Sequence, residues 1–189
     1  MQPICLVAIK TTLLVIYIGK CKTSTFTKGI LILSNKWDLR FLELARGIAE
    51  WSKDPSRKIG AIAVDDRSVV AQGYNGFPRG IEDYAERYED RDLKYKLVVH
   101  AEMNVIYNAT YNGVSLDGAT LYVWGLPVCG DCAKGVIQTG IKRVVMPKQD
   151  IPEHWAESWN LTKQMFEETN VRWEFIDVSN TGMDQRTIC

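Results

Sequence analysis

Hydrophobic positions along this chain recur first with the period of a helix and then with that of strands. In "WDLRFLELARGIAEWS", Phe41, Leu44 and Ile48 lie at helical spacing. Asp38 precedes them, and aspartate commonly caps the start of a helix. We therefore expect a helix that begins near Asp38 and ends before the proline of "SKDPSRK".

Shorter apolar runs follow, and they alternate with further helical patterns. Residues 59–65 and 68–74 predict two strands joined by a tight turn at residues 65–67. The polar, charged stretch at residues 76–96 predicts a long functional loop or lid. The remaining predicted elements are, in order, a helix at about 100–111, a strand at 119–125, a helix at about 129–139, a strand at 142–146, a helix at about 153–169 and a strand at 171–178. This alternation indicates an α/β layered sheet with a hairpin on its amino-terminal side.

The amino-terminal segment is apolar but does not fit a membrane span. In "ICLVAIKTTLLVIYIG", Lys10 interrupts the run, and the part after it is well short of the ~20 residues that a spanning helix needs. Residues 1–6 carry no charge, whereas a signal peptide has a basic start. We expect an extra strand or accessory extension over residues 1–35 and no membrane partner. A targeting segment and an artefactual upstream start are the alternatives.

Length, charge and cysteine content restrict the class of protein. The 189 residues suffice for one domain with a proper core. The 23 basic residues are balanced by 23 acidic ones, which argues against a polynucleotide partner and favours a small nucleotide. The five cysteines, at positions 5, 21, 129, 132 and 189, are too scattered for a disulfide framework, so we expect a reducing, cytoplasmic location.

Two of these cysteines belong to "LPVCGDCAKG", at the predicted start of a helix. Free N–H groups and the helix dipole favour thiolates there, so Cys129 and Cys132 suit either a redox dithiol or a shared metal ion. "VVHAEMN" adds His100 and Glu102 at another helix start, with 28 residues between His100 and Cys129. The histidine and the two cysteines supply three ligands and leave a fourth tetrahedral position open, as catalytic zinc requires. A redox pair, or each residue taken singly as core or helix start, leaves this combination unexplained, and the combination is the signature of zinc deaminases.

Four longer motifs extend this signature: "SKDPSRKIGAIAV", "GYNGFPRGIED", "KYKLVVHAEMN" and "CGDCAKGVIQTGIKRVV". Through them the chain resembles the cytidine deaminase superfamily and, within it, the deoxycytidylate (dCMP) deaminases, from about residue 37 to residue 178. The resemblance implies a three-layer α/β/α cytidine-deaminase-like fold with a central mixed sheet of about five strands. The deaminase domain would cover residues 36–179, followed by a polar tail at residues 180–189. The resemblance also implies hydrolysis of dCMP to dUMP and ammonia, and a homohexamer or smaller symmetric assembly.

By the same resemblance, His100, Cys129 and Cys132 hold one catalytic Zn²⁺ ion per chain. Glu102 then shuttles protons between water, the N3 atom of cytosine and the leaving amine.

Residues of the two earlier motifs are candidates for binding the substrate and effectors. The resemblance implies that Asn75 holds the sugar, although Asn-Gly is also the commonest tight turn. Ser52 and Lys53 are candidates for the substrate phosphate. Three arginines are candidates for a phosphate of the substrate or an effector, each with a solvated charged loop as the alternative: Arg79, Arg87 and Arg91. The resemblance further implies a site where dCTP, with Mg²⁺, activates and dTTP inhibits, near Gly73, Tyr74, Asn75 and Gly76.

The chain departs from the family pattern at three positions. Val128 stands between Pro127 and Cys129, where the family has proline directly before the first cysteine. We expect a bulge there that keeps both sulfurs in place and alters the fit of the substrate. Trp51 replaces an arginine that many members carry, and Met146 replaces an aromatic residue that often ends a strand.

Two alternative functions remain open. One is another zinc deaminase, acting on tRNA adenosine, cytidine, dCTP or a pterin or riboflavin precursor, although zero net charge argues against tRNA. The other is a non-catalytic zinc or redox module, which has no need of an acid at Glu102.

Overall fold

The computed structural model describes residues 24–179, with side chains from residue 36 onward. The chain divides into two compact units, Met1–Asn35 and Lys36–Cys189, and the contacts below belong to the second. The helices and strands that the structure describes are, in order, α2 (Ser24–Ala49), β1 (Gly60–Asp65), β2 (Ser68–Tyr74), α3 (Ala85–Glu89), α4 (Arg91–Leu97), α5 (Ala101–Tyr111), β3 (Thr120–Trp124), α6 (Gly130–Gln138), β4 (Arg143–Pro147), α7 (Glu153–Glu168) and β5 (Arg172–Ile176). No helix in this part of the chain is both long and apolar enough to cross a membrane. The expectations for residues 1–23 and 180–189 lie outside the described residues.

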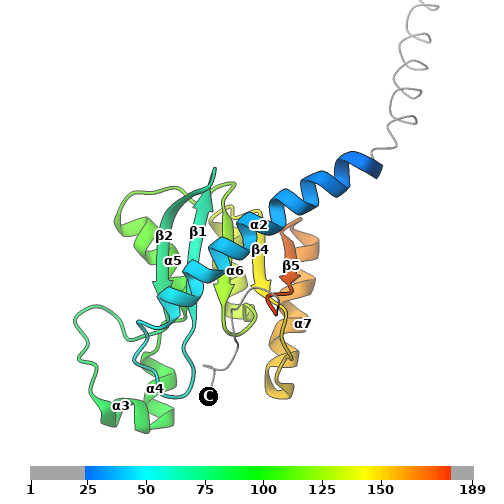
Figure 1. Ribbon diagram of the computed structural model, residues 1–189. Helices are drawn as coiled ribbons and strands as arrows, with labels where there is room; N and C mark the ends of the chain where they lie inside the picture. Colours follow the sequence, from blue (N-terminus) through cyan, green and yellow to red (C-terminus); the bar gives the residue numbers. More distant parts are fainter. Residues whose placement is uncertain (1–23, 180–189) are drawn as a thin grey trace, which may run out of the picture. The chain divides into compact units, whose positions relative to one another are not determined.

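The strands form one five-stranded mixed sheet in the order β2-β1-β3-β4-β5 (Figure 1). Strand β1 pairs antiparallel with β2 and β3, whereas β3, β4 and β5 run parallel. Parallel neighbours need a crossover connection, and α6 and α7 provide the two crossovers between β3 and β5. The predicted mixed sheet with an amino-terminal hairpin is confirmed.

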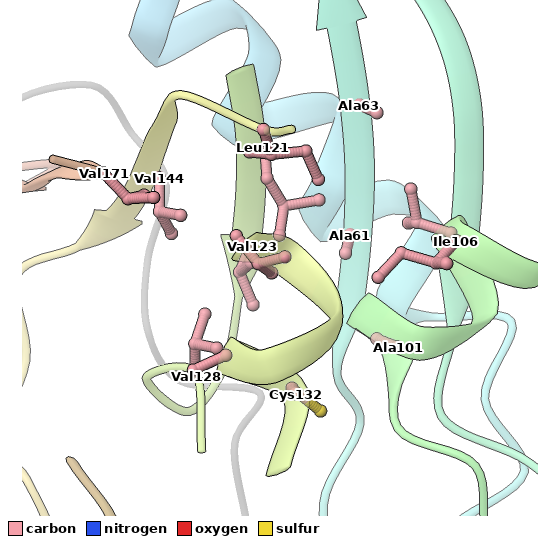
Figure 2. Packing of buried hydrophobic residues seen from close by; sticks show 14 of the residues in the cluster. Ala61, Ala63, Ala101, Ile106, Leu121, Val123, Val128, Cys132, Val144 and Val171 are labelled. Carbon is pink, nitrogen blue, oxygen red and sulfur yellow. The ribbon is translucent and has the colours of Figure 1, made fainter. Parts of the chain in front are cut away.

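Alternation along the strands divides the core into two layers. In β1, Ala61 and Ala63 are buried on the face covered by α5, α6 and α7. Ile62 and Val64 are buried on the opposite face, against α2. Figure 2 shows the first layer, with the small side chains of β1 among larger ones from β3 and α5. Because successive side chains of a strand point to opposite faces, the sheet lies between two helical layers, as the three-layer prediction required.

The turn between β1 and β2 also agrees with its prediction. Asp66 and Arg67 have φ values of 39° and 65°. Two central residues with positive φ are typical of the tight two-residue hairpin turn, whose twist matches that of the flanking strands.

Helix α5 lies directly on the backbone of β2. A Cβ atom on Gly73 would lie 2.6 Å from the N atom of Val105 and 2.7 Å from the carbonyl oxygen of Ala101. Only glycine permits this approach, and the approach sets the position of the amino-terminal end of α5.

The predicted helix start at Asp38 is wrong. Helix α2 begins at Ser24, so Asp38 lies within the helix, where its side chain is buried. Its carboxylate accepts two hydrogen bonds from Arg143, each of 2.8 Å, and one from the Tyr122 hydroxyl at 2.7 Å. Burial, and then the hydrogen bond to Asp38, raise the pKa of Tyr122. The cap pattern is local, whereas these partners lie 84 and 105 residues further along the chain.

The segment at residues 76–96 is only partly a loop, because it contains the short helices α3 and α4. Asp90 caps α4 by accepting a hydrogen bond from the N–H of Leu93 at 3.0 Å. Tyr88 of α3 stacks on Phe77 with ring centroids 4.4 Å apart, which holds α3 against the start of the segment. The prediction of a long loop missed these helices because each is too short to display an apolar period.

Replacing Asp38 by asparagine should destabilise the domain. Arg143 is largely buried and, within the part of the chain that the structure describes, would keep only Glu174 as an anionic partner. We expect the free energy of unfolding, measured by urea denaturation, to fall by about 3 kcal/mol, since breaking a buried ion pair costs about 3–5 kcal/mol. Glu43→Gln is the matched control, because Glu43 lies on the same helix and its pair with Arg46 is more exposed and worth less than about 1 kcal/mol. Equal losses in the two variants would contradict the role given to Asp38.

Candidate active site

Three metal-binding side chains meet at the starts of two helices. His100 is the N-cap of α5, Cys129 is the N-cap of α6, and Cys132 lies in the first turn of α6. The Nδ1 atom of His100 lies 3.4 Å from the Sγ atom of each cysteine, and the three ligand atoms all lie within 4.8 Å of one another. Ligands of a tetrahedral zinc ion place a nitrogen and a sulfur about 3.5 Å apart. The structure therefore brings together the predicted set in an arrangement that fits one zinc ion.

The electrostatics of this cluster suit a bound cation. The hydrogen bond with Cys129 raises the pKa of His100 to about 9, and burial only partly opposes it. The pKa of Cys129 is lowered, mainly because the Cys132 thiol donates a hydrogen bond to it and also because of His100. The same hydrogen bond, together with burial, raises the pKa of Cys132, so the two sulfurs share one negative charge. That charge attracts a metal ion, whose ligand is the thiolate.

Glu102 lies in the first turn of α5, two residues after His100, and its side chain is buried. Burial raises its pKa to about 7, while the charge of His100 acts in the opposite direction. A buried carboxyl group beside a metal cluster is the arrangement that acid–base catalysis requires.

His100 of this cluster lines a cavity of about 450 Å³, a size usual for small-molecule sites. His100 and Glu102 line this cavity, and so do Asn75 and Trp155. Three basic side chains also line it: Arg57, Arg91 and Lys94. The size and the mixed lining suit a polar molecule with a planar ring.

The carboxylate of Asp54 connects the segments of the cavity wall. Its Oδ1 atom accepts hydrogen bonds from Lys94 Nζ at 2.9 Å and from the N–H of Ser56 at 2.8 Å. Its Oδ2 atom accepts one from Asn75 Nδ2 at 3.4 Å. Asp54 and Lys94 are only 5% and 6% exposed, so breaking this pair would leave an uncompensated buried charge.

Sequence reasoning missed both members of this pair. A signal for Asp54 was present, because aspartate in a turn commonly accepts a hydrogen bond from the N–H two residues later. No local signal marks Lys94, whose partner lies 40 residues earlier in the chain.

Asn75, predicted to hold the sugar, is tied into the same wall. Its Nδ2 group donates to the carbonyl of Arg57 at 2.9 Å as well as to Asp54, and its Oδ1 atom accepts from the N–H of Ile59 at 2.8 Å. Asn75 thus lines the cavity as expected, and its part in sugar binding stays a prediction.

The two residues predicted to meet the substrate phosphate do not line the cavity. The Ser52 hydroxyl is buried, donates to the carbonyl of Asn75 at 2.8 Å and accepts from the N–H of Asp54 at 3.2 Å. The Lys53 side chain is 65% exposed and lies 3.1 Å from Asp83. Ser52 therefore supports the loop, Lys53 pairs on the surface, and their role in phosphate binding stays a prediction without support from their positions.

The residues predicted to lie near an effector site make contacts that support the fold. Gly73 permits the contact with α5, and Gly76 exchanges backbone hydrogen bonds of 3.1 and 2.8 Å with Val99. Tyr74 is 38% exposed and meets Trp51 edge-on, with ring centroids 6.2 Å apart. Effector binding at this segment stays a prediction.

The three candidate arginines lie in different places. Arg91 lines the cavity. Arg79 donates to the side chain of Asn108 at 2.5 Å, and Arg87 donates to the carbonyl of Glu82 at 2.9 Å, neither of them in the cavity wall. Of the three predictions, therefore, only the one for Arg91 is supported by the position of the residue in the cavity wall.

The additional residue before the first cysteine is held by α7. Val128 is fully buried, and its carbonyl accepts a hydrogen bond from the Thr162 hydroxyl at 2.9 Å. The carbonyl of Pro127 accepts one from Trp155 Nε1 at 2.8 Å. Trp155 and Thr162 lie seven positions apart, on one face of the helix. Both sulfurs nevertheless lie 3.4 Å from the Nδ1 atom of His100, as expected for sulfurs that keep their place. The bulge and the altered fit of the substrate stay predictions.

Met146, at the position of the family's aromatic residue, is fully buried in the core. An aromatic ring of the cavity comes instead from Trp155, at the start of α7, whose ring centroid lies 6.4 Å from that of His100. Sequence reasoning missed Trp155, because a helical pattern shows which face is apolar but not that an indole borders a cavity.

The chain matches the family described as "Cytidine and deoxycytidylate deaminase zinc-binding region" over residues 35–148, which include the metal cluster. The "Uncharacterized deaminase in luxG 3'region" of Aliivibrio fischeri is 36% identical over 148 residues, which cover 76% of this chain and 97% of that protein. The "Probable deoxycytidylate deaminase" of Drosophila melanogaster is 34% identical over 151 residues, which cover 73% of this chain and 71% of that protein.

Among solved structures, the chain is similar to the dCMP deaminase of the cyanophage S-TIM5 in its apo form. The TM-score is 0.59 at 24% identity, and the match covers 74% of this chain and 96% of that chain. At this identity the similarity supports the fold, which agrees with the sheet order and the helical layers described above.

Replacing Thr162 by valine should weaken the attachment of the loop before Cys129. The variant keeps the volume but leaves the buried carbonyl of Val128 without its hydroxyl donor. We expect the free energy of unfolding to fall by about 2 kcal/mol, because an unpaired buried polar group costs about 1–3 kcal/mol. Thr110→Val is the control in the same urea denaturation, since the Thr110 hydroxyl is exposed and bonds only to its own helix. If the two variants are equally stable, the hydroxyl of Thr162 does not hold the loop.

The metal cluster predicts about one zinc ion per chain, lost when His100 is replaced. Elemental analysis after dialysis should find zinc in the wild-type protein and little in His100→Ala, because two thiolates alone bind the ion more weakly. His154→Ala is the matched control, since His154 is the other of the chain's two histidines and lies outside the cluster. Full zinc content in His100→Ala would place the metal elsewhere.

Proposed function

The chain belongs to the cytidine and deoxycytidylate deaminase family, and on that premise we propose that it hydrolyses dCMP to dUMP and ammonia. The observation that carries the proposal is the buried acid Glu102, which lines the same cavity as His100, the histidine of the cluster with Cys129 and Cys132. Burying a carboxyl group costs free energy. A purely structural zinc site gains nothing from that cost, whereas a hydrolytic site uses the acid.

In this proposal His100, Cys129 and Cys132 would hold the zinc ion, and with three protein ligands the ion would remain open to solvent. A zinc ion held there supplies a water molecule of lowered pKa as the nucleophile. The protein contributes fixed positions for the ligands, because both N-cap residues stand where a helix backbone begins.

Glu102 moves the protons. Its carboxylate accepts a proton as the water oxygen attacks C4 of cytosine, and it delivers that proton to N3. It then takes a second proton from the new C4 hydroxyl and passes it to the exocyclic nitrogen. The C4–N bond breaks, ammonia leaves, and the oxygen of one water molecule remains on the base. Because Glu102 is only 4% exposed, bulk solvent has little access to the protons that it carries.

The positions of Trp155 and Asn75 in the cavity wall support a role for both in orienting the nucleoside. The Trp155 indole is anchored through Nε1 to the carbonyl of Pro127, and its flat face offers a surface on which a pyrimidine packs. Asn75 Oδ1 accepts one hydrogen bond, from the N–H of Ile59, so it keeps a second lone pair for a sugar hydroxyl.

The alternatives have less support. Zero net charge provides no general attraction for tRNA, and a non-catalytic module leaves the buried acid without a purpose. Deamination of cytidine or dCTP differs from that of dCMP in the number of phosphates, which a substrate comparison resolves. The effectors dCTP and dTTP with Mg²⁺ and a homohexamer or smaller symmetric assembly rest on family resemblance alone. A cytoplasmic location rests on the scattered cysteines.

Replacing Glu102 by glutamine should abolish turnover and retain zinc. Glutamine keeps the size of the side chain but cannot carry the proton, so we expect kcat for dCMP, measured by ammonia release, to fall about 10³-fold or more. Glu86→Gln is the control, since Glu86 is an exposed first-turn glutamate outside the cavity. Wild-type protein that is loaded with zinc and leaves dCMP, dCTP and cytidine unchanged would overturn the proposal.

A further inference from the structure

The cavity carries two arginines that no carboxylate neutralises. Arg57 and Arg91 both line it, and neither forms an ion pair with any residue that the structure describes. The lysine of the cavity, Lys94, is paired with Asp54 at 2.9 Å. The uncompensated positive charge of the wall is therefore on the two guanidinium groups, accompanied by the exposed carboxylate of Glu89.

Arg57 is held next to the residue proposed for the sugar. Its carbonyl accepts a hydrogen bond from Asn75 Nδ2 at 2.9 Å, and its N–H donates to Asp54 Oδ1 at 3.3 Å. The backbone of Arg57 is thus fixed. The residue is half-buried, and no side chain among residues 36–179 accepts a hydrogen bond from its guanidinium. If the base meets Glu102 and the sugar meets Asn75, the 5′-phosphate is the next group of the substrate and comes to Arg57.

Arg91 reaches the same cavity from α4. It lies three residues before Lys94, so the two side chains share one face of the helix. The buried pair of Lys94 and Asp54 holds this face against the loop that carries Arg57. The guanidinium of Arg91 lies 5.5 Å from the centroid of the Tyr95 ring, which orients the planar group and leaves its N–H groups available.

We propose that Arg57 and Arg91 form the subsite for the 5′-phosphate of the nucleotide and set a preference for the nucleoside monophosphate over the nucleoside. The inference rests on the proposed function and deepens it. A guanidinium presents a fork of donors that matches the oxygens of a phosphate. The rival residues are occupied elsewhere, because the Ser52 hydroxyl is bonded within its loop and Lys53 is paired with Asp83.

Steady-state kinetics of the zinc-loaded protein test the subsite. Arg57→Gln should raise KM for dCMP about 10- to 100-fold, the effect of a lost charged hydrogen bond. It should change kcat little, because the phosphate contact is the same in the ground state and the transition state. The inhibition constant of deoxycytidine, which lacks the phosphate, should not change. Arg57→Lys should recover part of the affinity, and Arg91→Gln should show a smaller rise in KM because Arg91 is exposed.

The control is Arg172→Gln, an exposed arginine on β5 outside the cavity, which should behave as wild type. A wild-type KM for dCMP in Arg57→Gln would overturn the inference and leave the proposed function standing. A raised KM in Lys53→Gln instead of Arg57→Gln would also overturn it. So would an equal weakening of dCMP and deoxycytidine binding in Arg57→Gln, which would indicate damage to the loop around Asn75. Wild-type protein that does not deaminate dCMP would remove the proposed function, and the subsite with it.

Discussion

The buried carboxylate of Asp54 is the connection on which the cavity wall depends. It joins the loop before β1, the end of β2 at Asn75 and helix α4 at Lys94. Hydrophobic packing could not hold these segments together, because the loop "DPSRK" offers almost no apolar side chain. A buried ion pair contributes little net free energy of folding, but it favours one arrangement of its two segments. If the segments separate, each charge is left buried without its partner. The wall is therefore held in one arrangement by a polar contact rather than by the core.

The metal cluster depends on a second constraint, the meeting of two helix starts. Helix α5 lies on the backbone of β2 at Gly73, which fixes the position of His100. Helix α7 holds the loop before α6, and there the N–H of Gly130 also donates to the Ser158 hydroxyl at 2.9 Å. Both contacts act on the backbone of the chain rather than on the metal-binding side chains. The extra residue Val128 is accommodated for this reason, because its carbonyl and that of the preceding proline are bonded to α7.

Local patterns predicted most of the fold and the reactive centre, and they failed where a partner is remote. The hairpin, the alternating strands and the His100–Cys129–Cys132 set each have a signal within a few residues. Asp38 has the local pattern of a cap, yet its partners come from β3 and β4, so the pattern predicted the wrong helix start. Lys94 was missed for the same reason. Hydrophobic periodicity describes a single helix or strand, so it does not predict an ion pair between two elements.

The basic residues of the cavity divide by burial into two kinds with different uses. Lys94 is 6% exposed and its Nζ atom donates to both Asp54 and the Ser56 hydroxyl, so binding a phosphate would require it to give up contacts that hold the wall. Arg57 and Arg91 retain contact with solvent and have no anionic partner among residues 36–179, so they can exchange water for a phosphate at little cost. Within one cavity, the buried cation therefore supports the structure, and recognition of an anion is left to the cations that remain hydrated.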